Sequence, residues 1–417
     1  MLNYFSYPHD RPEHADGDHI VASYLVYGAS HADILAKAGA FAVGQSVGTW
    51  IEVPGISNEM IERRQARALQ VVQAGDAEGG PTFLLRLAFP RENFGGSLAM
   101  LMTALVGNDV STALCARLVD LELSGAAADA YPGPKQGIGE LRALTGVKNR
   151  PLVLNMIKPC AGFTPEEGAK LFLEAAKGGV DLIKDDELLG SPAYNPVAKR
   201  TAAYLKAAEQ ARETSGRLTA YLPNISGPPR QMRENAKAVS EAGARACLVN
   251  FVFCGLDALA ELADEFGERL FIMAHYAGVG VMGWERGGIA NSVFLGILPR
   301  LAGAHAVMTM FPNRSDAAAR YDFYRTVQAQ RLPMRATRPI LTAVGGGVTP
   351  VNQAKLQEEL GPDTIIGIGG AIQGHPMGTT VGARTAMAAV AASARGIPLA
   401  EAAADDEGLR AALERWG

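Results

Sequence analysis

The chain has 417 residues, of which 48% are hydrophobic and 20% charged, with a net charge of -4. It can bury a large core in more than one domain, and it offers no basic field to attract nucleic acid. The longest apolar runs, 152–157 and 246–254, are as long as strands and too short to span a membrane.

The amino-terminal stretch, residues 1–19, is polar and acidic and lacks the charged-then-apolar layout of a signal peptide. The cysteines are widely scattered and form no CxxC pair, which is typical of reduced thiols. They are Cys115, Cys160, Cys247 and Cys254. We therefore expect a cytoplasmic protein with no membrane association.

Residues 1–130 are predicted to form a small α+β domain of the ferredoxin-like kind. The expected elements follow a β-α-β-β-α order. They are a strand at 18–27, a helix at 31–45, strands at 46–53 and 82–90, and a helix at 95–108. The segment 129–137, rich in Pro and Gly, is the expected linker to the next domain.

Residues 131–417 alternate short apolar runs with amphipathic helical stretches, and this pattern predicts a parallel sheet covered by helices. One of the helices should begin with a capping box at Thr164 and Glu167, and 402–417 should form a terminal helix. Eight strand units favour a (β/α)8 TIM barrel. An open doubly wound sheet is the alternative, although no GxGxxG follows the first strand. The expected strands are 152–159, 180–187, 218–226, 246–255, 270–278, 304–312, 339–347 and 364–372.

The second expected strand ends in the sequence Lys184-Asp185-Asp186-Glu187. Active sites of TIM barrels form at the carboxyl ends of the strands. Alternation along a strand would turn Lys184 and Asp186 the same way, and three carboxylates provide the oxygen ligands that Mg2+ prefers. The alternative is a surface salt-bridge cluster or a set of helix-capping acids.

Glycines follow the seventh and eighth expected strands, at Gly345, Gly346 and Gly347 and again at Gly367, Gly369 and Gly370. These two loops are the usual phosphate site of such barrels, and glycines let backbone N–H groups approach an anion closely. The glycines would otherwise only serve tight turns.

Three more side chains close strands of the barrel. Lys158 is a candidate acid or base, or a solvated lysine. His275 is a candidate for proton transfer or contact with a substrate hydroxyl, or a core histidine. Cys160 is expected to be a small apolar filler rather than a reactive thiol.

Together these motifs resemble the ribulose-bisphosphate carboxylase large-chain superfamily, and more closely its non-carboxylating members, the RuBisCO-like proteins. The resemblance spans nearly the whole chain. It is carried by residues 47–53, 105–108, 131–138, 150–159, 178–187, 273–278 and 367–378.

The resemblance implies that CO2 carbamylates Lys184, which then ligates Mg2+ together with Asp186 and Glu187. Carbamylation turns a cation that would repel the metal into an anionic oxygen ligand. Mg2+ would polarise a substrate carbonyl and stabilise the enediolate formed when a neighbouring C–H loses its proton.

The resemblance also gives roles to residues outside the metal centre. Lys158 matches the family's catalytic lysine on strand one, and His275 matches the histidine on strand five. Asn108 matches an asparagine that reaches the substrate from the amino-terminal domain of the other subunit. The resemblance therefore implies a homodimer with a shared active site.

Only one of the family's two phosphate sites is expected to remain. It would combine the partner subunit's copies of Thr49 and Trp50 with the glycines Gly346, Gly347, Gly369 and Gly370. The second site needs an arginine and a histidine where this chain has Tyr276 and Met308. A bisphosphate would leave a buried dianion uncompensated there. We therefore expect a monophosphate with an uncharged far end such as a thioether.

Other departures from the carboxylating enzymes argue against carbon fixation. The loop 312–320 has no lysine, although Arg314 could partly replace one. Cys160, Gly345 and Gly44 stand where the carboxylases have a lysine, a serine and a glutamate.

Three activities of RuBisCO-like proteins remain candidates. We expect an isomerase of 5-methylthioribulose 1-phosphate that uses Lys158, as part of methionine salvage. The first alternative is 2,3-diketo-5-methylthiopentyl-1-phosphate enolase, whose branch shares the Arg-Trp-Gly ending 415–417 but has a lysine at the position of Asn108. The others are a decarboxylase of 3-oxo-isoapionate 4-phosphate and, outside catalysis, a ligand-binding regulatory barrel.

Overall fold

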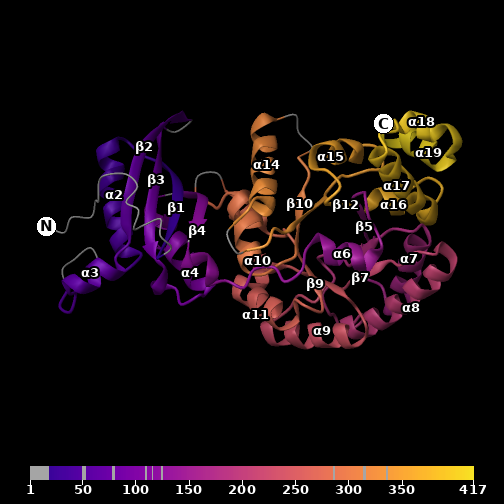
Figure 1. Cartoon of the computed structure of the whole chain (residues 1–417), viewed down its shortest axis with the longest axis horizontal. Helices are drawn as coiled ribbons and strands as arrows, with labels where there is room; N and C mark the ends of the chain where they lie inside the picture. The colour runs from indigo at the N-terminus through magenta and orange to yellow at the C-terminus, as the bar shows by residue number, and fades with distance from the viewer. Residues whose placement is uncertain are drawn as a thin grey trace. The chain divides into compact units, whose positions relative to one another are not determined.

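The computed structural model of the protein forms two compact units, drawn in Figure 1. The first comprises Met1–Gly133, Gly278–Ala302 and Tyr321–Pro339, and the second comprises Pro134–Ala277, Gly303–Arg320 and Ile340–Gly417. The residues that the structure describes are 18–48, 53–77, 80–108, 110–114, 116–123, 125–284, 287–312, 316–334 and 337–417. Within these ranges, no helix has both the length and the apolar character needed to cross a bilayer.

The first unit contains a four-stranded antiparallel sheet with the order β2-β3-β1-β4. Helix α2 covers it, and the Phe41 ring of this helix packs edge-on against Tyr24 of β1 with ring centroids 5.6 Å apart. Apolar side chains on one face of the sheet thus meet the apolar side of a helix, as expected for an α+β domain. The strands are His19–Tyr27 (β1), Arg67–Ala77 (β2), Gly80–Pro90 (β3) and Arg117–Leu123 (β4). The helices include His31–Gly44 (α2), Asn58–Arg64 (α3), Leu98–Val106 (α4) and Ala126–Asp129 (α5).

The predicted α+β domain is confirmed, but its strands are corrected. Of the expected strand at 46–53, the described residues 46–48 and 53 are not in a strand, and 49–52 lie outside the described residues. The sheet instead uses β2 and β4, which the sequence pattern did not indicate. Both are edge strands with exposed polar residues, so they lack the apolar signature of a central strand.

The second unit contains the predicted barrel. Its sheet has eight parallel strands in the order β7-β6-β5-β12-β11-β10-β9-β8. A parallel bridge between Asn224 and Leu248 links the two ends of this order, just beyond β7. The strands are Leu152–Met156 (β5), Leu182–Lys184 (β6), Ala220–Leu222 (β7), Ala246–Val249 (β8), Phe271–Ala274 (β9), Ala306–Met310 (β10), Leu341–Gly345 (β11) and Thr364–Ile368 (β12).

Helices surround these strands. The capping box expected at the start of α7 is present, with Thr164 and Glu167 bonding each other's backbone N–H groups. The expected strand at 246–255 is wrong in its second half, because the chain turns at Asn250 into helix α10. The helices of this unit include Ile138–Thr145 (α6), Pro165–Lys177 (α7), Val197–Ser215 (α8), Pro229–Glu241 (α9), Phe251–Cys254 (α10), Leu256–Phe266 (α11), Gln353–Leu360 (α15), Gly370–Gln373 (α16), Thr379–Ala394 (α17), Leu399–Ala402 (α18) and Glu407–Trp416 (α19).

Three buried aromatic rings join α7 and α8 to the barrel wall. Phe172 of α7 lies 5.2 Å from Tyr204 of α8 and 5.6 Å from Tyr221 of β7, measured between ring centroids. All three side chains are almost fully buried. Because the Tyr221 hydroxyl donates to Asp185 at 2.8 Å, this cluster also supports the chain just after β6.

We predict that Phe172→Ala lowers the free energy of unfolding by about 3–5 kcal/mol, because it leaves a cavity among three rings. Phe172→Leu retains most of the volume and should lose less than half as much. Urea unfolding followed by circular dichroism measures both variants. A loss below about 1 kcal/mol for the alanine variant would show that the cluster collapses around the cavity.

Candidate active site

A pocket of about 340 Å³ lies at the carboxyl ends of the barrel strands. Residues that follow β5, β6, β9, β11 and β12 contribute to it, as the barrel architecture leads one to expect. The pocket is lined by Met156, Lys158, Lys184, Asp186, Glu187, His275, Tyr276, Met308, Gly346, Gly347, Val348, Thr349, Gly367, Gly369, Gly370, Ala371 and Trp416.

Lys184 is the last residue of β6 and its side chain is only 1% exposed. Its Nζ donates to the Asp185 carbonyl at 3.0 Å and lies 3.2 Å from Glu187 Oε2. Burial lowers the pKa of Lys184 and outweighs the opposing attraction of Glu187 and Asp186. The neutral amine, which is the form that reacts with CO2, is thereby favoured.

Lys158 follows β5 and forms an ion pair with Asp186, with 2.6 Å between Nζ and Oδ2. Burial opposes the charges of both groups and is the largest single effect, but the hydrogen bonds and charge attractions around each group together outweigh it. The pKa of Lys158 is therefore raised and that of Asp186 is lowered. The Lys158 Nζ also lies 3.1 Å from Cys160 Sγ, which places this half-buried thiol beside the pocket.

His275 follows β9, and its Nε2 lies 3.3 Å from Glu187 Oε2. Burial is the main reason why the pKa of His275 falls to about 3, so the ring is neutral at physiological pH. Because Nδ1 accepts the N–H of Ala277, the remaining ring proton is assigned to Nε2, facing Glu187. Tyr276 stacks on this ring with centroids 4.6 Å apart.

Asp185 has a structural role, which corrects the expectation of three metal-binding carboxylates. Its side chain points away from the pocket and accepts from Arg200, the Tyr221 hydroxyl and the Asn224 N–H. Asp185 and Arg200 are both fully buried. The expected strand alternation also ends early, because β6 stops at Lys184 and Asp186 belongs to the following turn.

Two asparagines hold the backbone that carries the acidic residues. Asn224 Nδ2 donates to the carbonyls of Asp186 and Glu187, and Asn250 Nδ2 donates to the Glu187 carbonyl at 2.8 Å. These residues follow β7 and β8, and we did not single them out from the sequence. Their position in the sequence could have indicated this role, because polar residues that follow barrel strands lie at the active-site end of the barrel.

The glycine loops line the pocket beside the acidic residues. Gly346 and Gly347 adopt positive φ angles of 81° and 86°, a conformation that glycine allows without strain. A Cβ on Gly370 would meet nothing within 4 Å, so space is open beside this backbone. This arrangement leaves open space beside the loop that precedes α16, where the sequence predicts a phosphate site.

The barrel interior is apolar where the family's second phosphate group would need cations. Met308 is 2% exposed and packs in the central core with Met156 and Tyr276 beside it. A Cβ on Gly345 would lie 2.2 Å from the Met308 methyl group, so this glycine makes room for the methionine. The pocket therefore offers an uncharged surface on this side.

Four residues that the sequence predicts for the site remain. Asn108 lies in the first unit, exposed, beyond the end of α4. Thr49, Trp50 and Arg314 lie outside the described residues. The roles expected for these four residues stay predictions.

Mg2+ prefers oxygen ligands, and the pocket contains carboxylates that could provide them. Among the described residues, no three or more His, Cys, Asp and Glu side chains are grouped as metal ligands. Asp186 and Glu187, both with lowered pKa values, provide two carboxylates. Carbamylation of Lys184 would supply a third anionic ligand and remove the ammonium that would repel the metal. The donor set fits Mg2+ in that form.

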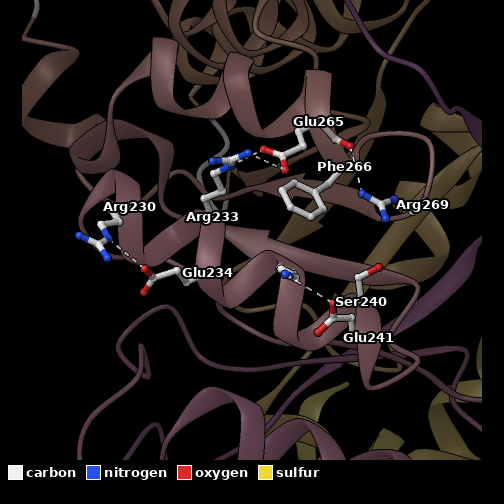
Figure 2. Close-up of a pocket in the computed structure, with 9 residues that line it drawn as sticks. Arg230, Arg233, Glu234, Ser240, Glu241, Glu265, Phe266 and Arg269 are labelled. Carbon is white, nitrogen blue, oxygen red and sulfur yellow. Dashed lines mark hydrogen bonds and ion pairs between the residues drawn. The ribbon is translucent and has the colours of Figure 1, made fainter.

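A second hollow, of about 420 Å³, lies along α9 and the end of α11 and is shown in Figure 2. Three of its cations form ion pairs with carboxylates. Arg230 contacts Glu234 at 3.0 Å, and Arg233 contacts Glu265.

The chain matches two family models over most of its length. Residues 9–124 match the amino-terminal domain of the ribulose bisphosphate carboxylase large chain, and residues 137–416 match its catalytic domain. The chain therefore belongs to the ribulose-bisphosphate carboxylase large-chain superfamily, as the sequence motifs predicted.

Individual relatives narrow this similarity to the RuBisCO-like proteins. A ribulose bisphosphate carboxylase-like protein of Archaeoglobus fulgidus is 33% identical over 98% of this chain and 97% of its own length. The 2,3-diketo-5-methylthiopentyl-1-phosphate enolase of Geobacillus kaustophilus is 33% identical over 95% of this chain and 98% of its own length. The crystal structure of a RuBisCO-like protein (MtnW) from Alicyclobacillus acidocaldarius superposes with a TM-score of 0.88 at 35% identity, covering 96% of this chain and 99% of that one.

The buried pair beside the site provides a test of its architecture. We predict that Arg200→Met lowers the free energy of unfolding by about 3–5 kcal/mol, because Asp185 would remain buried without its cation. The double variant Arg200→Met with Asp185→Asn should recover part of that loss. Chemical denaturation measures both, and equal losses in the single and double variants would contradict this account.

Proposed function

We propose that the protein enolises a small phosphorylated carbonyl compound in the barrel pocket. The observation that carries this proposal is the meeting of Lys158, Asp186, Glu187 and a buried Lys184 beside the two glycine loops. A proton-transfer group, a cluster of oxygen ligands and an open anion site thus surround one cavity. Removal of a proton next to a carbonyl needs the first two, and the anion site would hold a phosphorylated substrate in place.

In this proposal Asp186, Glu187 and carbamylated Lys184 hold Mg2+. When bound, Mg2+ supplies a positive charge that stabilises the oxyanion of an enolised substrate. Lys158 forms an ion pair with Asp186. It can take a substrate proton at Nζ only when that contact is released and the amine is neutral. Neutral His275 keeps its Nε2 proton available for a hydrogen bond.

The glycines after β11 and β12 bind the single phosphate, and the surface around Tyr276 and Met308 faces the uncharged end. The named relatives favour 2,3-diketo-5-methylthiopentyl 1-phosphate over 5-methylthioribulose 1-phosphate. The enolase alternative therefore replaces the isomerase as the leading candidate.

One residue favours the isomerase as the second candidate. Asn108 stands where the enolase branch has a lysine, so Lys158 would have to move the proton without that group. We also propose that two chains form a homodimer in which the partner subunit completes the site. Support comes from the superfamily match and from a similar structure of a dimeric archaeal RuBisCO from Hyperthermus butylicus, with a TM-score of 0.88 at 29% identity.

We predict that 13C-labelled CO2 with Mg2+ gives a carbamate signal in the NMR spectrum of the protein. The signal should grow as the pH rises through the lowered pKa of Lys184, because only the neutral amine reacts. Lys184→Ala should remove the signal, while the exposed control Lys170→Ala should retain it. A signal that survives in Lys184→Ala would contradict the assignment.

For the reaction, we predict deuterium incorporation from D2O into 2,3-diketo-5-methylthiopentyl 1-phosphate or 5-methylthioribulose 1-phosphate. Proton and phosphorus NMR identify the product and separate enolase from isomerase. Lys158→Met should slow exchange by at least about 100-fold, the scale of general acid–base catalysis, with Lys170→Met as the control. Absence of exchange in the Mg2+- and bicarbonate-treated wild type, or an unaffected Lys158→Met variant, would refute the proposed reaction. Release of CO2 from 3-oxo-isoapionate 4-phosphate without exchange of the other two would identify a decarboxylase instead.

A further inference from the structure

Trp416 lies in the last turn of α19 and lines the barrel pocket, although α19 follows the eighth barrel strand by some distance along the chain. The same pocket is also lined by Gly369, Gly370 and Ala371, around the start of α16. Figure 1 shows α16, α17 and α19 gathered in the same part of the second unit. An aromatic side chain from the end of the fold thus joins the predicted anion site.

Helix α19 is fixed firmly enough to position a side chain. Asp406 caps its first turn by accepting from the Leu409 N–H at 2.9 Å, and Leu409 packs in a core cluster with Ala389 of α17. A Cβ on Gly408 would lie 2.4 Å from Thr385 Oγ1, so the glycine allows close approach of α19 to α17.

His375 connects this helix to the loop after α16. Its Nε2 lies 3.0 Å from the Gly408 carbonyl, and its Nδ1 accepts from Met377 N–H at 3.2 Å. Its ring contacts that of Trp416, with centroids 6.0 Å apart and the two planes tilted by 50°. The indole is thereby held against the segment that carries Gly369 and Gly370.

The indole N–H of Trp416 makes no hydrogen bond to any residue that the structure describes. Trp has only this one polar group, and it donates. The same pocket is lined by Gly370, where a Cβ would meet nothing within 4 Å, so space is open at this backbone. A site lined by N–H donors suits an anion with several oxygens.

We propose that Trp416 is a further binding residue of the substrate site, whose indole N–H donates to the phosphate group bound by Gly369 and Gly370. This inference rests on the phosphate site of the proposed function and adds to it a residue from the carboxyl-terminal helix. Trp416 takes no part in proton transfer, so it determines affinity for the phosphorylated end and leaves the chemistry to Lys158 and the metal centre.

The test measures binding of inorganic phosphate to the full-length protein, treated with Mg2+ and bicarbonate, by isothermal titration calorimetry. Trp416→Phe retains the ring and removes the donor, and it should weaken phosphate binding by about tenfold, as expected for a hydrogen bond to a charged group. Trp416→Ala should weaken it at least as much. Arg415→Ala, an exposed neighbour on the same helix, is the matched control and should bind phosphate like the wild type.

A second measurement separates binding from folding and from the identity of the reaction. Trp416→Phe should raise the KM of whichever phosphorylated compound the enzyme converts and leave kcat within about twofold, and its thermal unfolding midpoint should match that of the wild type. Unchanged phosphate affinity in Trp416→Phe, or an equal loss in Arg415→Ala, would overturn the inference. Phosphate binding that depends on Trp416 would support it even if none of the three candidate substrates reacted, whereas a wild type that binds no phosphate would refute it.

Discussion

The site depends on the path of the chain at the end of strand β6. Lys184 and Asp185 are both buried there, but Lys184 lines the pocket whereas Asp185 pairs with Arg200. Asp185 forms an ion pair with Arg200 and receives further hydrogen bonds from Tyr221 and the Asn224 backbone. A buried carboxylate needs all of these partners to offset its loss of hydration. Their directions fix the backbone at Asp185, so the residues before and after it, Lys184 and Asp186, reach the pocket.

The pocket then contains two lysines and two carboxylates in close balance. Lys158 pairs with Asp186, and Lys184 contacts Glu187. Burial destabilises the charged form of Lys184 and lowers its pKa, because this side chain is fully enclosed. In the proposed carbamylation, the neutral amine of Lys184 would react with CO2 and become a third anionic ligand, which would favour a divalent cation. The arrangement therefore explains why a lysine in a metal site need not exclude the metal.

Much of this fold follows from sequence pattern, and the exceptions have physical reasons. The barrel strands are short apolar runs buried on both faces, so they stand out between amphipathic helices. Edge strands β2 and β4 carry polar residues and were missed for that reason. Asp185, Asp186 and Glu187 look equivalent as letters, and only the tertiary position of Arg200 separates their roles. Trp416 reaches the pocket through packing of α19 on α17, which no local pattern indicates.

In the proposed function, the substrate end of the pocket separates this protein from the carboxylases of its superfamily. Met308 and Tyr276 form an uncharged surface where a second phosphate would require cations, and the enolase-named relatives fit a monophosphate. The central claim is that Lys184 becomes a metal ligand by reacting with CO2. Titration of the protein with Mg2+ by calorimetry, with and without bicarbonate, tests it most directly. We expect binding of one ion per chain that requires bicarbonate and is lost in Lys184→Ala, whereas equal Mg2+ affinity with and without bicarbonate would contradict the account.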